Sequence, residues 1–157
     1  MDDMRFLADS MLGRLAKWLR VLGYDTHYQA SYPPGVMDAL IREGRLLLTR
    51  HRKRAEKSGK RAVFIHGNHV SEQLIALTRE LHMTPPPSAW FNRCLICNTQ
   101  LRQACESDAR EKVPEYVFYQ NMGRIRFCPS CDRYFWPGSH RWTMAAQLRE
   151  WGFPLDR

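Results

Sequence analysis

The stretch that decides the fold spans residues 6–25 and reads FLADSMLGRLAKWLRVLGYD. Residues 4–8, at its start, have the composition of a short strand that ends at Asp9. After Asp9 the apolar residues recur at helical spacing with basic residues between them, and Gly23 favours a helix end. The pattern predicts a strand followed by an amphipathic helix with a basic outer face.

The same alternation continues as far as residue 82. Strand-like runs lie at 25–28, 45–49 and 62–66, and helical patterns lie at 36–42 and 70–82. Strands that alternate with helices indicate an α/β fold with a parallel sheet flanked by helices. Ligands of such sheets bind beyond the carboxyl ends of the strands. We expect the polar residues at those ends to converge: Asp9, Thr49, Arg50, His51, His66, Asn68 and His69.

The composition limits the class of protein. The chain has 157 residues, a formal net charge of +8 and 44% hydrophobic residues. These values indicate one domain, or one domain with a small satellite, and enough apolar side chains for a core. The apolar runs stop short of the roughly 18 residues that a membrane span needs, and no secretory signal opens the sequence. We expect a cytoplasmic protein with no membrane partner.

Two CxxC pairs, CLIC at 94–97 and CPSC at 128–131, are separated by 30 residues. Four thiolates from two such turns match the tetrahedral coordination of Zn²⁺, and four protein ligands leave no open position for catalysis. The spacing therefore predicts a structural zinc site in a zinc ribbon, with a redox or metal-free pair of motifs as the alternative. The predicted ligands are Cys94, Cys97, Cys128 and Cys131. Cys105 has no partner motif and is interpreted as an ordinary thiol.

The run Pro85-Pro86-Pro87 favours an extended path and indicates a linker. We place an α/β domain at 1–86 and a zinc ribbon with a C-terminal helix at 87–157. Within the second part, 116–119 and 124–127 favour strands, and 140–151 favours a helix.

Positive charge is concentrated in residues 50–61, which contain seven basic residues and a single acidic one. Such a stretch is typical of a surface that binds a phosphate backbone, or of a solvated helix face. The ribbon adds cations and aromatic rings that can stack on single-stranded bases, or form the core of a small module. These are Arg124, Arg126, Arg133, Tyr134, Phe135, Trp136, His140, Arg141 and Trp142.

Asp9 is the most informative residue of the first part. A carboxylate directly after a strand can hold a metal at the ligand edge of a sheet, or it can cap the following helix. From its position on a predicted helix, Asp38 is interpreted as a surface carboxylate. His51, His66 and His69 are interpreted as ordinary loop histidines.

Several motifs occur together in order: residues 6–25, GRLLLTR at 44–50, RCLICN at 93–98, and CPSCDRYFWPGSH at 128–140 followed by Met144. This set closely resembles the Mutator-seven C-terminal RNase domain family, from Arg5 to about Leu148. The resemblance implies a PIN-like α/β nuclease domain followed by a zinc ribbon. It also implies RNA hydrolysis by acids at the strand ends that hold Mg²⁺ or Mn²⁺.

By this resemblance Asp9 is the first acid, and Asp38 matches the helix acid after the second strand. The family pattern Leu-Thr-Arg-Asp is replaced here by Leu48-Thr49-Arg50-His51, and Asn68 stands where another acid is common. The resemblance thus implies a catalytic set of Asp9, Asp38, His51 and Asn68, in which the two acids hold the catalytic ion. His51 is suited to general-base chemistry or to Mn²⁺ or Zn²⁺.

The leading hypothesis is a metal-dependent ribonuclease or RNA-processing protein. RNA contacts are expected from Arg14, Lys17, Arg50, Arg52, Lys53 and Arg54. The alternative is a non-catalytic RNA-binding or ribosome-associated protein on the same fold, and a third possibility is a toxin-like or protein-partnered PIN module. The sequence indicates RNA as the partner and leaves the oligomeric state open.

Overall fold

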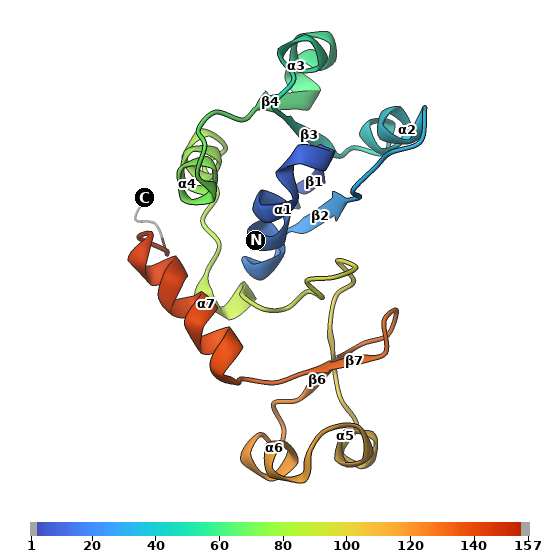
Figure 1. Ribbon diagram of the computed structural model, residues 1–157, viewed down its shortest axis with the longest axis vertical. Helices are drawn as coiled ribbons and strands as arrows, with labels where there is room; N and C mark the ends of the chain where they lie inside the picture. Colours follow the sequence, from blue (N-terminus) through green and yellow to red (C-terminus); the bar gives the residue numbers. More distant parts are fainter. Residues whose placement is uncertain (1–2, 155–157) are drawn as a thin grey trace.

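The computed structural model describes residues 3–154 and contains a parallel sheet in its N-terminal half (Figure 1). Its strands are β1 (Arg5–Ala8), β2 (Asp25–Tyr28), β3 (Leu46–Thr49) and β4 (Ala62–Phe64). They follow the order β2-β1-β3-β4, and each neighbouring pair is parallel. The α/β fold predicted from the alternation is confirmed.

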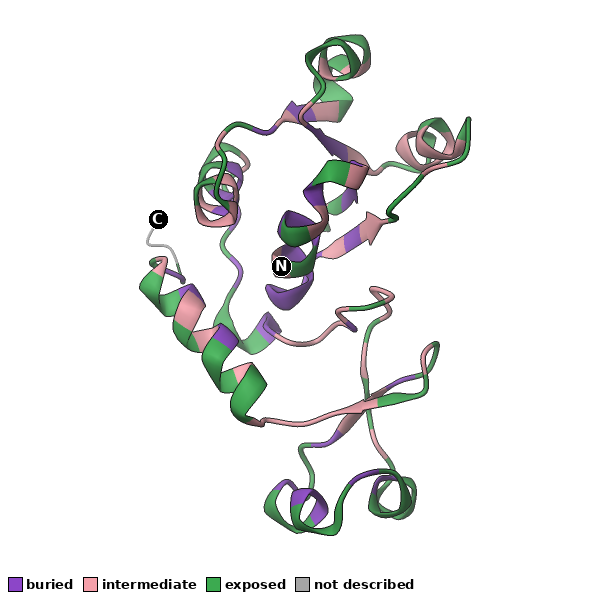
Figure 2. Cartoon of the chain, in the orientation of Figure 1, coloured by how far each residue is buried: buried purple, intermediate pink, exposed green. Residues whose placement is uncertain are grey.

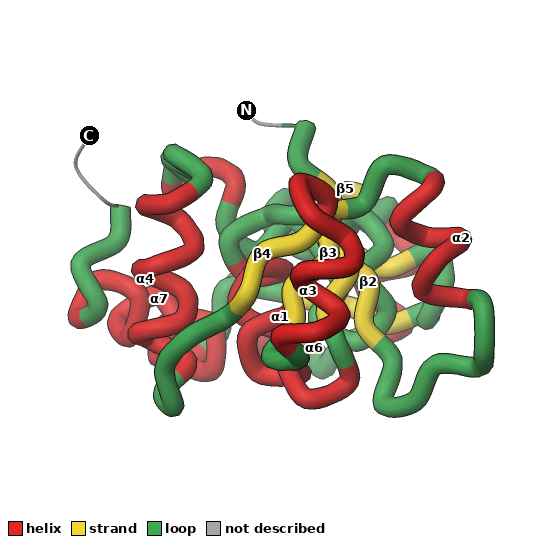
Figure 3. Tube along the Cα trace, turned by 90° about the horizontal axis from the view of Figure 1, so that it is seen from above, coloured by secondary structure: helices red, strands yellow, loops and turns green. Residues whose placement is uncertain are grey.

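Four helices connect or follow these strands: α1 (Gly13–Val21), α2 (Val36–Arg42), α3 (Arg52–Ser58) and α4 (Val70–Glu80). Seen from above, the sheet lies between α4 on one side and α2 on the other (Figure 3). The apolar stripe of α1 is buried in the main core, as its helical spacing predicts. Gly23 ends this helix with φ +98°, and a Cβ there would lie 2.5 Å from the backbone oxygen of Ala89.

The burial pattern separates α3, and likewise α2, from the central strands of the sheet. Helix α3 has no buried residue, whereas β1 and β3 are almost completely buried (Figure 2). Because α3 carries most of the basic stretch, its cations lie on the outside of the domain, next to the end of β3. The strand ends therefore open beside a strongly positive helix.

The second part contains the antiparallel strands β5 (Arg102–Gln103), β6 (Arg126–Cys128) and β7 (Arg133–Phe135), in the order β5-β6-β7. Two short helices lie between β5 and β6: α5 (Glu106–Lys112) and α6 (Glu115–Gln120). The predicted strand at 116–119 is wrong, because this segment forms α6. Helical spacing buries Val113, Val117 and Phe118 against Ala109 in a second small core, which an extended chain could not do.

The C-terminal helix α7 (Ser139–Glu150) confirms the helix predicted at 140–151. It does not pack only on the ribbon. Met144, Leu148 and Phe153 belong to the same buried cluster as the sheet, and the rings of Trp151 and Trp18 meet edge to face at 4.7 Å. Helix α7 therefore returns from the ribbon to the main core of the sheet domain (Figure 1). No helix within residues 3–154 is long and apolar enough to cross a membrane.

Candidate active site and candidate metal centre

Asp9 lies directly after β1 and is buried, with 4% of its surface exposed. Its backbone N–H donates to the oxygen of Leu48 at 2.9 Å, which extends the pairing of β1 with β3 by one residue. Its Oδ1 accepts a hydrogen bond from the N–H of Met11 at 3.4 Å, so Asp9 is the N-cap of the 3₁₀ helix η1 (Ser10–Leu12). The capping interpretation of Asp9 is confirmed, and its second oxygen remains for other partners.

The second carboxylate oxygen is held by Thr49, the fully buried last residue of β3. The hydroxyl Oγ1 of Thr49 donates to Oδ2 of Asp9 at 2.9 Å. The same hydroxyl oxygen accepts the backbone N–H of His51 at 3.0 Å. One hydroxyl group therefore holds Asp9, at the end of β1, close to His51, the N-cap residue of α3.

Two basic side chains face the same carboxylate oxygen. Nη1 of Arg54 lies 3.1 Å from Oδ2 of Asp9, and Nε2 of His51 lies 3.7 Å from it. The side chain of His51 is 55% exposed, whereas that of Asp9 is 5% exposed. A buried carboxylate can orient an imidazole through one nitrogen and leave the other nitrogen accessible. The cluster of Asp9, Thr49, His51 and Arg54 is called the strand-end site below.

The other two predicted catalytic residues are placed differently. Asp38 is exposed in the first turn of α2 and lines a cavity of about 740 Å³ together with Arg54 and Tyr32. Within residues 3–154, the ion pairs and hydrogen bonds of Asp9 do not include Asp38. Asn68 is exposed in the loop between β4 and α4. The structure brings His51 to Asp9, places Asp38 in the cavity beside them, and leaves Asn68 on a loop.

The donor set at Asp9 does not fit a hard divalent ion as it stands. Mg²⁺ and Mn²⁺ favour several oxygen ligands. Here both oxygens of Asp9 accept hydrogen bonds, and the ionisable groups closest to them are the bases His51 and Arg54. Among residues 3–154, the four cysteines form the one group of three or more His, Cys, Asp or Glu ligands at metal-binding distance.

The cations expected to contact RNA fall into two groups. Arg14, Lys17, Arg52 and Lys53 have exposed side chains. Arg50 is half-buried, and its Nη1 donates to the oxygen of Ile65 at 3.3 Å and to that of Gly67, which braces the loop after β4. Arg54 contacts Asp9, so these two arginines already have partners inside the protein.

The four predicted zinc ligands come together. The Sγ atoms of Cys94, Cys97, Cys128 and Cys131 all lie within 4.8 Å of one another and could hold a metal such as zinc. Cys94 and Cys128 are buried, and Cys97 and Cys131 are half-buried. This set fits Zn²⁺, because a tetrahedron with Zn–S bonds of about 2.3 Å needs sulfur atoms at such spacing.

The hydrogen bonds within the cysteine cluster act unequally on its thiols: the pKa of Cys94 is raised by burial and that of Cys131 by its contact with Cys97, whereas that of Cys97 is lowered. The N–H of Cys131 lies 3.3 Å from Sγ of Cys128. Burial opposes ionisation of Cys97, but the hydroxyl and N–H of Thr99 outweigh it and lower the pKa of Cys97 to about 6. Cys105 is exposed and lies outside the cluster, as its isolated position in the sequence predicts.

Sequence reasoning selected Asp9 and His51 as candidates but did not predict that Thr49 and Arg54 contact Asp9. The strand register contained a signal for Thr49: Ala8 pairs with Leu48, so the next residues, Asp9 and Thr49, are neighbours across the strands. Arg54 belongs to a run of similar cations, and nothing local distinguishes the one that turns toward Asp9.

The comparison with protein families gives one match, the Mut7-C RNAse domain, which covers residues 4–148. No curated protein and no solved structure matches the chain significantly.

Proposed function

The chain belongs to the Mut7-C RNAse domain family, and from this membership we propose that it is a ribonuclease that hydrolyses RNA at the strand-end site. The observation that carries the proposal is the buried carboxylate of Asp9 facing the half-exposed imidazole of His51 at 3.7 Å and the guanidinium of Arg54 at 3.1 Å. The parallel sheet with an acid directly after β1 also supports the PIN-like architecture that the sequence motifs imply.

In this proposal His51 is the general base. The carboxylate of Asp9 faces Nε2 at 3.7 Å, an electrostatic contact longer than a hydrogen bond, and Nδ1 takes a proton from the attacking water. The water oxygen forms a bond to phosphorus, the bond from phosphorus to the leaving ribose oxygen breaks, and that oxygen takes a proton from solvent. Imidazole side chains are the commonest general bases in proteins, which supports His51 in this role.

Arg54 binds the phosphate that is attacked. A guanidinium has five donors, so Arg54 can keep one hydrogen bond to Asp9 and use others for phosphate oxygens. Fixed cations at such a position stabilise the negative charge that develops in the transition state. The exposed cations of α3 continue this positive surface and would contact neighbouring phosphates.

A metal-dependent ribonuclease is the second candidate. The observation that favours it is the cavity that Asp38 lines together with Arg54, because Arg54 also contacts Asp9, the other acid expected to hold Mg²⁺ or Mn²⁺. The side chains around Asp9 do not offer the several oxygen ligands that Mg²⁺ or Mn²⁺ needs. No step of the reaction is therefore assigned to a metal ion. The four cysteines are proposed to hold Zn²⁺ in a purely structural role.

The test uses zinc-loaded protein and labelled single-stranded RNA in Mg²⁺, in Mn²⁺ and in chelator, with zinc content measured in every sample. We expect His51→Asn and Asp9→Asn to lower cleavage at least about 100-fold, which is the usual loss when a general base is removed. His82→Asn is the matched control, since His82 is an exposed histidine with φ 54° and asparagine tolerates that backbone.

Three results would count against the proposal. Full activity of His51→Asn would exclude the general-base role. Strict dependence on Mg²⁺ or Mn²⁺ together with loss in Asp38→Asn would replace it by the metal-dependent candidate. Binding of RNA without cleavage under every condition would identify a non-catalytic RNA-binding protein.

A further inference from the structure

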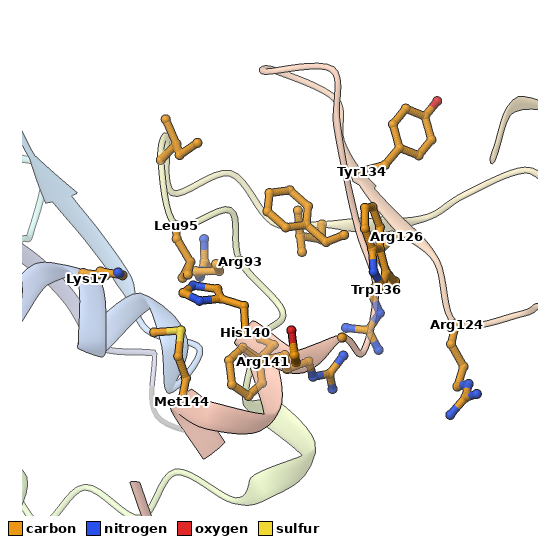
Figure 4. A pocket seen from close by; sticks show the side chains of 16 residues that line it. Lys17, Arg93, Leu95, Arg124, Arg126, Tyr134, Trp136, His140, Arg141 and Met144 are labelled. Atoms are coloured by element: carbon orange, nitrogen blue, oxygen red, sulfur yellow. The ribbon is translucent and has the colours of Figure 1, made fainter. Parts of the chain in front are cut away.

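A second cavity, of about 660 Å³, lies where the ribbon meets the sheet domain. Figure 4 shows the side chains that line it coming from three directions. Lys17 comes from α1, Arg126 and Trp136 come from the β6–β7 hairpin, and Arg141 comes from the first turns of α7. A volume of this size is typical of sites that bind small molecules or parts of larger ligands.

The charge of this cavity is entirely positive. Five lysine or arginine residues and no acidic residue line it: Lys17, Arg93, Arg124, Arg126 and Arg141. None of the five takes part in an ion pair within residues 3–154. Concentrated positive charge without a carboxylate attracts anions, phosphate above all.

The partners of these cations inside the protein are neutral. Arg126 donates to the side-chain oxygen of Asn92, and Arg124 donates to the backbone oxygen of Gln120 at 2.8 Å. The guanidinium of Arg141 lies over the ring of Phe91, 4.8 Å from its centre. Burial lowers the pKa of Arg141, and the charges of Arg126 and Arg124 lower it further, so an anion among these groups would relieve their repulsion.

Aromatic rings form a second part of the cavity, beside aliphatic residues such as Leu95, Leu101 and Met144. Phe91, Tyr134 and Trp136 all line it and are half-buried. A Cβ at Gly138 would lie 3.1 Å from Nε1 of Trp136, so the glycine leaves room for the indole beside the start of α7. Flat aromatic surfaces next to arginines bind nucleobases by stacking.

We propose that this cavity binds one nucleotide of an RNA strand, with the phosphate between Arg126 and Arg141 and the base against Trp136. The combination of cations and stacking surfaces distinguishes this ligand from an acidic peptide, which offers carboxylates but no stacked base. The choice of RNA as the strand rests on the proposed function. Binding in the cavity does not depend on cleavage, because no residue of the strand-end site lines it.

The cavity therefore adds a binding subsite that is separate from the strand-end site. It joins elements of both parts of the chain, since Lys17 belongs to the same α1 that follows Asp9 and η1. A strand held here and at α3 would be fixed at two points of the protein. We therefore expect RNA that is long enough to contact both the cavity and α3 to bind more tightly than RNA that contacts only one of them.

The test measures binding of fluorescein-labelled single-stranded RNA to full-length, zinc-loaded protein in the His51→Asn background. We expect Arg126→Gln and Arg141→Gln each to weaken binding about tenfold and to lower the salt slope by about one phosphate contact. Arg102→Gln is the matched control, because Arg102 is an exposed arginine of the neighbouring strand β5 that does not line the cavity. It is expected to bind within twofold of the parent.

A second readout is the quenching of tryptophan fluorescence by RNA, which Trp136→Phe should reduce. Zinc content and the melting temperature show that each variant is folded. Unchanged RNA affinity in both Arg126→Gln and Arg141→Gln would overturn the proposal. If free 5′-AMP bound more tightly than RNA, the ligand would be a free nucleotide and not a strand. If poly-glutamate competed as well as RNA, the cavity would bind anions in general and not a nucleotide. A wrong nuclease proposal would give a different result: the wild-type protein would not cleave RNA, but the RNA affinities of the wild type and the variants would still differ as predicted here.

Discussion

The carboxamide of Asn98 holds the carboxylate of Asp25 at the junction between the ribbon and the sheet. Nδ2 of Asn98 donates to Oδ1 of Asp25 at 2.6 Å, and Oδ1 of Asn98 accepts the backbone N–H of Thr26 at 2.9 Å. Asn98 follows the first cysteine pair directly, and Asp25 begins the edge strand β2. The cysteine cluster is therefore attached to the sheet domain by specific polar contacts.

Asn98→Ala is expected to destabilise the protein. It removes two hydrogen bonds, one of them to a charged group, and should lower the free energy of unfolding by about 1–3 kcal/mol. Urea denaturation measures this change. Gln100→Ala, an exposed position in the same loop, is the control and should change stability by less than about 0.5 kcal/mol. Equal effects of the two variants would show that Asn98 does not anchor the ribbon.

Asp25 makes stability depend on pH. Burial alone would raise the pKa of Asp25, but hydrogen bonds from Arg45 and Asn98 outweigh it and hold the pKa below 3.8. The folded state therefore favours the carboxylate, and this stabilisation is present above pH 3.8 and is lost as the pH falls through the lower folded pKa. Denaturation midpoints measured across this window should fall more steeply for wild type than for Asp25→Asn. Parallel profiles would refute the assignment.

Thr49→Val tests the positioning of the strand-end site. Valine keeps the shape of the buried side chain but removes the hydroxyl that joins Asp9 to the backbone of His51. We expect a loss of about 1–3 kcal/mol in stability and a lower kcat with little change in KM. Thr49→Ser restores the hydroxyl and should recover kcat. A Thr49→Val enzyme with wild-type kcat would contradict this role.

The cysteine cluster predicts one zinc ion per protein molecule. Cys128→Ser removes a buried ligand and should abolish stable zinc binding, because three sulfur ligands leave the tetrahedron incomplete. Cys105→Ser is the control, since that thiol is exposed and outside the cluster. Metal analysis after gel filtration distinguishes the two. Full zinc content in Cys128→Ser would exclude the proposed coordination.

Leu148→Ala tests whether α7 completes the main core. Leu148 is fully buried in that cluster, and truncating such a leucine costs about 2–5 kcal/mol. Arg149→Ala, exposed at the next position, should alter stability by less than about 0.5 kcal/mol. Thermal unfolding of both variants measures the difference. A small effect at Leu148 would mean that the helix is attached only loosely.

Much of the fold could be predicted from the sequence where one local pattern dominates. The apolar spacing of α1, the strand before Asp9 and the approach of the two CxxC pairs to each other were each predicted from a local pattern, and the structure has all three. The failure at 116–119 has a physical cause. Tyrosine, valine and phenylalanine favour strands by propensity, but burial of Val117 and Phe118 against α5 decides for a helix.

The candidate site was predictable only in part. The position of Asp9 follows from the strand order, whereas the contact of Arg54 with it depends on how α3 turns after His51. The roles of Asp38 and Asn68 stay predictions. The cavity at the ribbon was out of reach, because Lys17 and Arg141 are more than a hundred residues apart in the sequence.

The return of α7 to the sheet domain sets the order in which the chain can assemble during synthesis. The cysteines end at Cys131, whereas the main core also needs Met144, Leu148 and Phe153. The segment that carries the four cysteines is therefore complete before α7 is added, while the sheet still exposes the apolar surface that α7 later covers. Until α7 packs on it, this exposed surface makes the incomplete core prone to aggregation.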